Sequence, residues 1–248
     1  MIPTSATTFI SDPYVRRYRD NDEWRATIFR DMILDDAKTR GTDLTFLDIG
    51  CGKGFDGDEL LQREIARVAG QYIGIEPDPD IKMGDYFAQV HRTTLEDAPI
   101  ERGSIDVAFA IMVLEHLGDP QPFWDKLWDV LAPNGVFWAL TVDGRHPFCR
   151  GSFWMQKLKF KELYLNGVFG ERGTDRYENY PVHYRCNTPE QVEAFARRFT
   201  SCDFVNFARV GQLNAYYPKL FHGLASAVDR RLIRHIKVGT LLAVRAEK

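Results

Sequence analysis

Three glycines at alternate positions mark the segment of this chain that is best suited to hold a small ligand. Gly50, Gly52 and Gly54 follow an apolar run at 45–49 and precede a helix-like segment that begins near Asp58. A strand that ends in a glycine turn before a helix is the first half of a nucleotide-binding βαβ unit. Glycine suits this turn because it accepts unusual backbone angles and lets a ligand approach the main chain closely.

Two acidic residues indicate what kind of ligand this turn would hold. A dinucleotide site favours G-x-G-x-x-G, in which a pyrophosphate lies on the helix N-terminus, whereas this chain has G-x-G-x-G. Asp48 precedes the first glycine, where a carboxylate repels a pyrophosphate and attracts an ammonium group. Glu76 ends the next apolar run, 71–75, and is placed to accept hydrogen bonds from both hydroxyls of a ribose. The pattern predicts an adenosine-like ligand with a zwitterionic tail and no phosphate.

Three ordered segments, 46–54, 75–78 and 113–117, resemble the motifs of class I S-adenosylmethionine-dependent methyltransferases. More narrowly, Glu115-His116 followed by Asp119-Pro120 resembles the small-molecule branch that includes the ubiquinone-biosynthesis O-methyltransferases. The resemblance implies an enzyme that uses S-adenosyl-L-methionine, with Thr94 at a position where the family often has an acid. The cofactor contacts implied by the matching positions are Asp48, Gly50, Cys51, Gly52, Gly54, Glu76, Pro77, Thr94, Leu95, Ala110 and Ile111.

The alternation of apolar runs and helical segments predicts an α/β fold, a doubly wound Rossmann-like sheet of seven strands with helices on both faces. Strands are expected at 45–49, 71–75, 86–91, 104–111 and 136–141, with two closing strands at 203–210 and 238–246. Asp119 is expected to cap a helix that starts at Pro120 and ends at the Pro-Asn-Gly segment 133–135. The Thr-Pro-Glu-Gln segment 188–191 has the form of a capping box at the start of another helix.

The chain of 248 residues is interpreted as one methyltransferase domain over 1–248. It has a helical lead-in at 1–43, in which Arg16, Arg17 and Arg19 either reach the cofactor carboxylate or lie on a solvated helix face. Two lid-like insertions, 143–187 and 211–237, are expected to form the acceptor side, because loops of this length are usually binding elements. Both insertions are locally basic, which suits an anionic acceptor. The second also carries apolar residues near helical spacing, which either pack on the domain or contact an anionic membrane surface.

Histidines are the candidates for chemistry on the acceptor. Methyl transfer to a hydroxyl group is assisted by a general base, and histidine is the natural base near neutral pH. His116, His146 and His183 follow predicted strands or lie in the first insertion, and each is either the base or a packed side chain. The expected reaction is O-methylation of a small molecule or a sugar. The alternatives are a non-catalytic methyltransferase-like scaffold subunit and a tRNA methyltransferase.

Other features argue against further functions. Met112 stands where some relatives have a second acid, and Asp143 lacks acidic neighbours, so no metal is expected. The segment 110–113 is unlike the Asp/Asn-Pro-Pro-Tyr of base-modifying relatives, so DNA is not an expected partner. No apolar run is long enough to cross a membrane and no secretory signal is visible. The four cysteines form no CxxC pair, which fits a cytoplasmic protein. A homodimer is one way in which the apolar first insertion would be covered.

Overall fold

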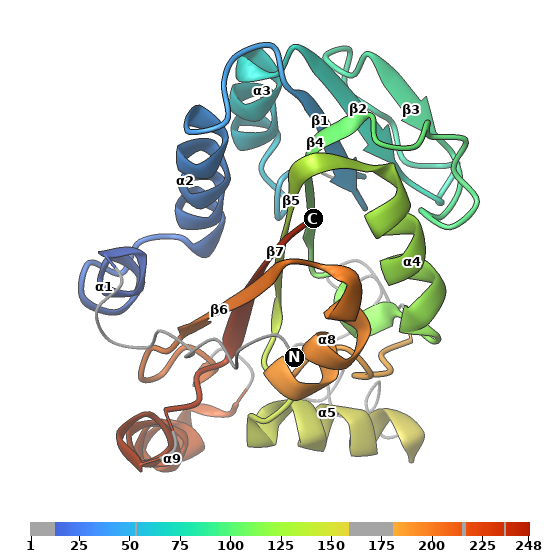
Figure 1. Cartoon of the computed structure of the whole chain (residues 1–248). Helices are drawn as coiled ribbons and strands as arrows, with labels where there is room; N and C mark the ends of the chain where they lie inside the picture. The colour runs from blue at the N-terminus through green and yellow to red at the C-terminus, as the bar shows by residue number, and fades with distance from the viewer. Residues whose placement is uncertain (1–12, 53, 159–180, 215–216, 236) are drawn as a thin grey trace.

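One mixed sheet organises the structure, a computed structural model that describes residues 13–52, 54–158, 181–214, 217–235 and 237–248 (Figure 1). Among these residues the strand order is β3-β2-β1-β4-β5-β7-β6. The strands are β1 (Thr45–Ile49), β2 (Gln71–Ile75), β3 (Gln89–His91), β4 (Ile105–Ile111), β5 (Leu131–Val142), β6 (Ser201–Phe207) and β7 (Leu241–Glu247). The first five are parallel to one another, and β7 runs antiparallel to both β5 and β6. The predicted seven-stranded Rossmann-like fold is confirmed.

Helices cover both faces of this sheet (Figure 1). One face carries α1 (Pro13–Asp20), α2 (Arg25–Lys38) and α3 (Glu59–Val68), and the other carries α4 (Pro120–Val130) and α8 (Pro189–Phe195). Two further helices, α5 (Pro147–Lys157) and α9 (His222–His235), lie beyond the end of the sheet at which β5 ends. Three short 3-10 turns complete the described part, η1 (Leu114–His116), η2 (Ala196–Arg198) and η4 (Lys219–Phe221).

Each face of the sheet has its own apolar core. In β4, Val107 and Phe109 belong to the core beneath α2 and α3, whereas Ala108 and Ala110 belong to the core beneath α4. This alternation follows from the period of two residues in a strand. Both faces of the central strands are therefore buried, which explains why their sequences read as continuous apolar runs.

The helix caps lie close to where the sequence predicts them. The Asp119 side chain accepts a hydrogen bond from the Gln121 N–H at the start of α4, and Thr188 caps α8 in the same way. The capping box is altered, because Gln191 Oε1 accepts from the Asn187 N–H at 3.0 Å rather than from Thr188.

Some predicted boundaries are wrong. α4 ends at Val130 and β5 begins at once, so the segment 133–135 lies within the start of β5, where the register with β4 shifts, and does not end the helix. The closing strands are shorter than predicted, since β6 ends at Phe207 and β7 begins only at Leu241.

Two of the lead-in arginines, Arg17 and Arg19 of α1, form ion pairs with nearby acids. Arg17 pairs with Glu23 and with Asp31, and Arg19 pairs with Asp20 at 2.7 Å. These ion pairs match the interpretation of a solvated helix face. Residues 1–12 of the expected lead-in lie outside the described residues.

Asp36 of α2 joins this helix to β5 and β7. Its Oδ2 accepts hydrogen bonds from Trp138 Nε1 and from Arg245 Nε, each at 2.8 Å. Burial alone raises the pKa of this carboxyl, but Arg245, Trp138 and Arg40 outweigh it and hold the pKa of Asp36 below its ordinary value. The ionised form is thus the one that stabilises the fold.

We expect Asp36→Ala to lower the free energy of unfolding by about 2–3 kcal/mol, because it removes the acceptor of the Trp138 indole N–H and of Arg245 Nε. Urea unfolding at neutral pH measures the loss. Asp35→Ala is the matched control, since Asp35 is exposed and its ion pair with Lys38 should contribute no more than about 1 kcal/mol. Equal losses in the two variants would contradict the role given to Asp36.

Candidate cofactor and acceptor site

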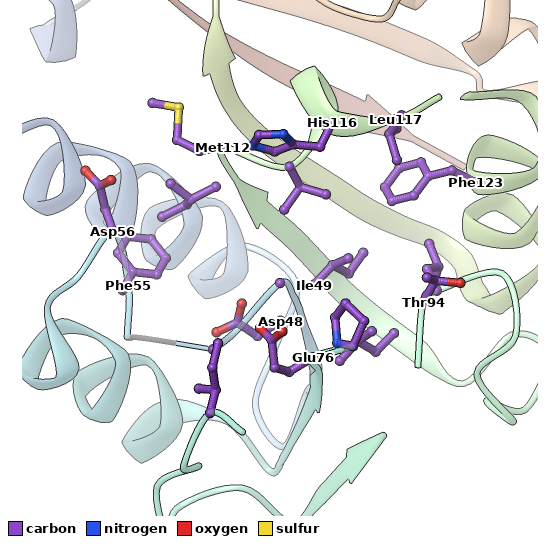
Figure 2. A pocket seen from close by; sticks show the side chains of 18 of the residues that line it. Asp48, Ile49, Phe55, Asp56, Glu76, Thr94, Met112, His116, Leu117 and Phe123 are labelled. Atoms are coloured by element: carbon purple, nitrogen blue, oxygen red, sulfur yellow. The ribbon is translucent and has the colours of Figure 1, made fainter. Parts of the chain in front are cut away.

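A cavity of about 820 Å³ opens at the carboxyl ends of β1, β2 and β4. Ligands of open α/β sheets bind in this position because the loops that leave the strands diverge there. Figure 2 shows Asp48 and Glu76 at one end of the cavity and His116, Leu117 and Phe123 at the other. The site therefore has an acidic end and a histidine-bearing, largely apolar end.

Most of the residues predicted for cofactor binding line this cavity. Those that do are Asp48, Gly50, Gly52, Gly54, Glu76, Pro77, Thr94, Leu95 and Ile111. The side chains of Cys51 and Ala110 do not, because the Cys51 thiol donates to the Ile75 carbonyl and Ala110 packs in the core beneath α4. Both positions still neighbour lining residues along the chain.

Asp48, in β1, is a buried carboxyl held by two hydrogen bonds. Its Oδ2 accepts from the Tyr72 hydroxyl at 2.6 Å and from Gln62 Nε2 at 2.8 Å, and Gln62 in turn accepts from the Tyr86 hydroxyl. Burial, reinforced by the charge of Glu76, raises the pKa of Asp48 to about 6, although the bonds from Tyr72 and Gln62 oppose the shift. Two carboxylates at the cavity wall create a place where a cation would be stabilised.

Glu76 at the end of β2 is fixed against the glycine turn. Its Oε1 accepts a hydrogen bond from the Asp78 N–H at 2.9 Å. A Cβ added at Gly52 would overlap Glu76 Oε2, so the missing side chain of Gly52 is what lets this carboxylate face the cavity. Gly50 has φ +77°, a left-handed conformation that L residues with a side chain rarely adopt.

His116 at the end of η1 has a defined tautomer when neutral. Its Nδ1 lies 3.0 Å from the Pro181 carbonyl oxygen, which can only accept, so Nδ1 carries the proton and Nε2 carries the lone pair. His116 lines the same cavity as Asp48 and Glu76. A neutral imidazole in this state can take a proton at Nε2.

His183 lies on the same wall and is held through the main chain of Glu115. The Glu115 carbonyl accepts from the His183 N–H at 2.7 Å, and Glu115 Oε2 accepts from the Thr141 hydroxyl at 2.8 Å. Burial raises the pKa of Glu115, although the neighbouring His116 opposes the shift. This buried acid connects η1 to the end of the first insertion.

His146, the third predicted histidine, lies outside the cavity. It precedes α5 and its Nδ1 accepts from the Phe148 N–H, while its Nε2 is 3.7 Å from Asp229 Oδ1 of α9. The second insertion, 211–237, contributes no lining residue among the described positions, whereas the first contributes Pro181 and His183.

Several lining residues have no counterpart in the sequence-based prediction. They are Ile49, Phe55, Asp56, Gly57, Ile75, Ile81, Glu96, Met112, Val113, Leu117, Phe123 and Pro181. Ile49, Ile75, Val113 and Leu117 belong to recognised motifs, but most of the others come from loops. Asp56 also has φ +54° and pairs with Arg25 at 2.6 Å, a long-range contact that periodicity does not reveal.

Several known proteins that resemble this chain are methyltransferases. A family model described as a methyltransferase domain matches residues 47–137. The ubiquinone biosynthesis O-methyltransferase of Escherichia coli O9:H4 (strain HS) is 32% identical over an alignment of 178 positions, and the match covers 57% of this chain and 74% of that protein.

Solved structures share the fold at low identity. A SAM-dependent methyltransferase from Archaeoglobus fulgidus is 13% identical with a TM-score of 0.55, covering 96% of this chain and 100% of that one. Haemonchus contortus phosphoethanolamine N-methyltransferase 2, in complex with phosphomonomethylethanolamine and S-adenosylhomocysteine, is 14% identical with a TM-score of 0.54. The superposition covers 94% of this chain but only 60% of that enzyme's length.

The fold, the glycine turn and these relatives define an enzyme that uses S-adenosylmethionine. The chain belongs to the class I S-adenosylmethionine-dependent methyltransferases, and its cofactor is S-adenosyl-L-methionine. Within that class it is similar to the ubiquinone biosynthesis O-methyltransferases.

Two features of the described residues bear on other predictions. They contain no group of three or more His, Cys, Asp or Glu side chains that could hold a metal ion. No helix in the described part of the chain is long and apolar enough to cross a membrane. The absence of a metal and the cytoplasmic location remain predictions.

Asp48→Asn should separate stability from binding. Because the pKa of Asp48 lies near 6 in the fold and at 3.8 ordinarily, ionising it opposes folding. This ionisation does not lower the free energy of unfolding below about pH 4, and above about pH 6 it lowers it by its full amount, on the order of 1–3 kcal/mol. We expect Asp48→Asn to raise the free energy of unfolding of the ligand-free protein by that amount at about pH 8 and not at about pH 4, measured with urea.

The same variant should bind the cofactor about tenfold more weakly, because an amide does not neutralise an ammonium group. Calorimetry should show wild-type affinity for S-adenosylmethionine falling below about pH 6, with no such fall for Asp48→Asn. A variant that is destabilised at pH 8 and binds with wild-type affinity would show that Asp48 is only structural.

Gly52→Ala should weaken S-adenosylhomocysteine binding by about tenfold or more, because its Cβ displaces the Glu76 carboxylate. Gly151→Ala in α5 is the control, since nothing lies within 4 Å of its added Cβ. Calorimetric affinities that are the same for wild type and both variants would rule out this use of Glu76.

Proposed function

We propose that this methyltransferase transfers the methyl group of S-adenosylmethionine to a hydroxyl group of a small molecule or a sugar, with His116 as the general base. The observation that carries the proposal is the hydrogen bond between His116 Nδ1 and the Pro181 carbonyl, because it leaves the lone pair on Nε2. His116 lies across the cavity from Asp48 and Glu76 (Figure 2).

The acidic end of the cavity is suited to the cofactor. We assign Asp48 to the region of the ammonium group and Glu76 to the ribose hydroxyls, since each carboxylate lies at the end of a strand beside the glycine turn. Thr94 and Leu95 line the same cavity and are assigned to the adenine ring, for which a hydroxyl and a main-chain N–H offer hydrogen bonds. The bound cofactor supplies an activated methyl group, and the chain positions the acceptor.

The histidine end is suited to a hydroxyl nucleophile. The acceptor oxygen forms a bond to the methyl carbon as the bond from sulfur breaks, and its proton passes to His116 Nε2. Met112, Val113 and Leu117 line the wall beside His116 and would exclude water from this step. His183 is exposed on the same wall, where it can orient the acceptor. His146 is not part of the proposal, because it lies outside the cavity.

The relatives support oxygen as the accepting atom. The similar Escherichia coli proteins are named as O-methyltransferases, and they match more than half of this chain. The structural neighbours at about 14% identity include an N-methyltransferase, so the fold alone does not select the accepting atom.

We expect His116→Gln to lower kcat for a hydroxylated acceptor about 10²-fold or more, because the general base is lost. The assay follows labelled methyl transfer from S-adenosylmethionine to a panel of phenols, alcohols and sugars. Affinity for S-adenosylhomocysteine should stay within about twofold of wild type, since the acidic end is unchanged.

His183→Gln is the matched comparison and should raise KM more than it lowers kcat. Unchanged kcat in His116→Gln, or turnover on amines with none on hydroxyl groups, would contradict the proposal.

A further inference from the structure

An apolar stripe on α9 and the turn before it faces away from the protein. Leu220, Phe221, Leu224 and Val228 form this stripe and are 87%, 49%, 65% and 40% exposed. Leu224 and Val228 are four residues apart in α9 and therefore lie on one side of this helix, and Leu220 and Phe221 precede them in η4. Large apolar side chains gathered in this way usually mark a binding surface.

A different side of α9 is fixed to the domain. Asp229 is the buried residue of this helix, and its Oδ2 accepts from the Gly211 N–H at 2.8 Å. Its Oδ1 lies 3.7 Å from His146 Nε2. These polar contacts hold α9 in an orientation in which the residues of the apolar stripe remain between 40% and 87% exposed.

Positive charge borders the apolar stripe. Lys219, Arg230, Arg231 and Arg234 are all exposed, whereas Asp229, the one acid among described residues 217–235, is buried. An amphipathic helix with apolar residues on one side and arginines beside them is typical of a segment that lies in the interface of an anionic bilayer. The long arginine side chains can extend to lipid headgroups while the stripe enters the acyl region.

Helix α5 also carries an exposed aromatic side chain. It lies with α9 beyond the end of the sheet at which β5 ends (Figure 1), and Phe148 contacts Tyr217 with ring centroids 6.3 Å apart. Trp154 is 56% exposed, and Lys157 Nζ lies 5.3 Å from the centre of its ring. Tryptophan and lysine are both favoured at the boundary between lipid and water.

We propose that α9, with the apolar stripe as its contact, docks this protein on the surface of a membrane that contains anionic lipids. A nucleic acid would use the arginines but gain nothing from three aliphatic side chains, and a second copy of the same surface would bring like charges together. A bilayer with negative headgroups satisfies both the apolar and the basic residues. The proposal is independent of the acceptor that the enzyme methylates.

Vesicle flotation of the full chain tests this docking. We expect binding to vesicles of mixed phosphatidylcholine and phosphatidylglycerol, and at least tenfold weaker binding to phosphatidylcholine alone. Leu224→Glu should weaken binding to the anionic vesicles at least tenfold, because a charge replaces a buried leucine. Leu60→Glu is the matched control, since Leu60 is 71% exposed on α3 and should change nothing.

Charge is tested separately. The double variant Arg231→Glu/Arg234→Glu should also lose binding at least tenfold, and salt should weaken the wild type. All variants should bind S-adenosylhomocysteine like wild type, which shows that they are folded.

The proposal is overturned if the wild-type protein does not bind anionic vesicles. It is also overturned if Leu224→Glu binds them as well as Leu60→Glu does. Two further results would overturn it. One is that the protein does not bind vesicles and instead forms a dimer that Leu224→Glu dissociates. The other is that the protein does not bind vesicles and instead binds RNA equally well with and without Leu224→Glu.

Discussion

A buried carboxylate at the end of β1 is the constraint on which the cofactor site depends. Asp48 is removed from water and held by Tyr72 and Gln62, and it faces the same cavity as Glu76. Two acids so placed oppose each other's ionisation, and burial adds to the cost. A positively charged ligand relieves both effects, so the site is destabilised when empty and complementary when filled. The same placement disfavours a phosphate, which agrees with a cofactor that has none.

The sheet makes this arrangement possible. Because β1 and β2 are parallel neighbours in register, with Ile49 opposite Ile75, their carboxyl ends bring Asp48 and Glu76 to one edge. β4 is the other neighbour of β1, and the chain that leaves it forms η1 and delivers His116 to the far side of the cavity. The two chemically different ends of the site thus come from strands that are adjacent in space and separated in sequence.

The sequence predicts the features that depend on local patterns. The five parallel strands, the caps at Asp119 and Thr188 and most residues at the acidic end of the cavity follow from apolar periodicity, turn chemistry and ordered motifs. It does not separate His116 and His183 from His146, because that choice depends on how α5 and α9 pack together. It also misses Asp56 and Pro181, which reach the cavity from loops. The end of α4 is misjudged because Leu131 pairs with Ile105 before the Pro-Asn-Gly segment is reached.

The partner of His116 is a main-chain oxygen, and this has a consequence for how such an enzyme can diversify. Every residue type presents the same carbonyl, so the side chain at position 181 can change without altering the protonation of the imidazole. What must persist is the path of the backbone that brings this carbonyl within 3.0 Å of Nδ1. Substitution at this position is then tolerated, while the imidazole nitrogen that carries the lone pair stays the same.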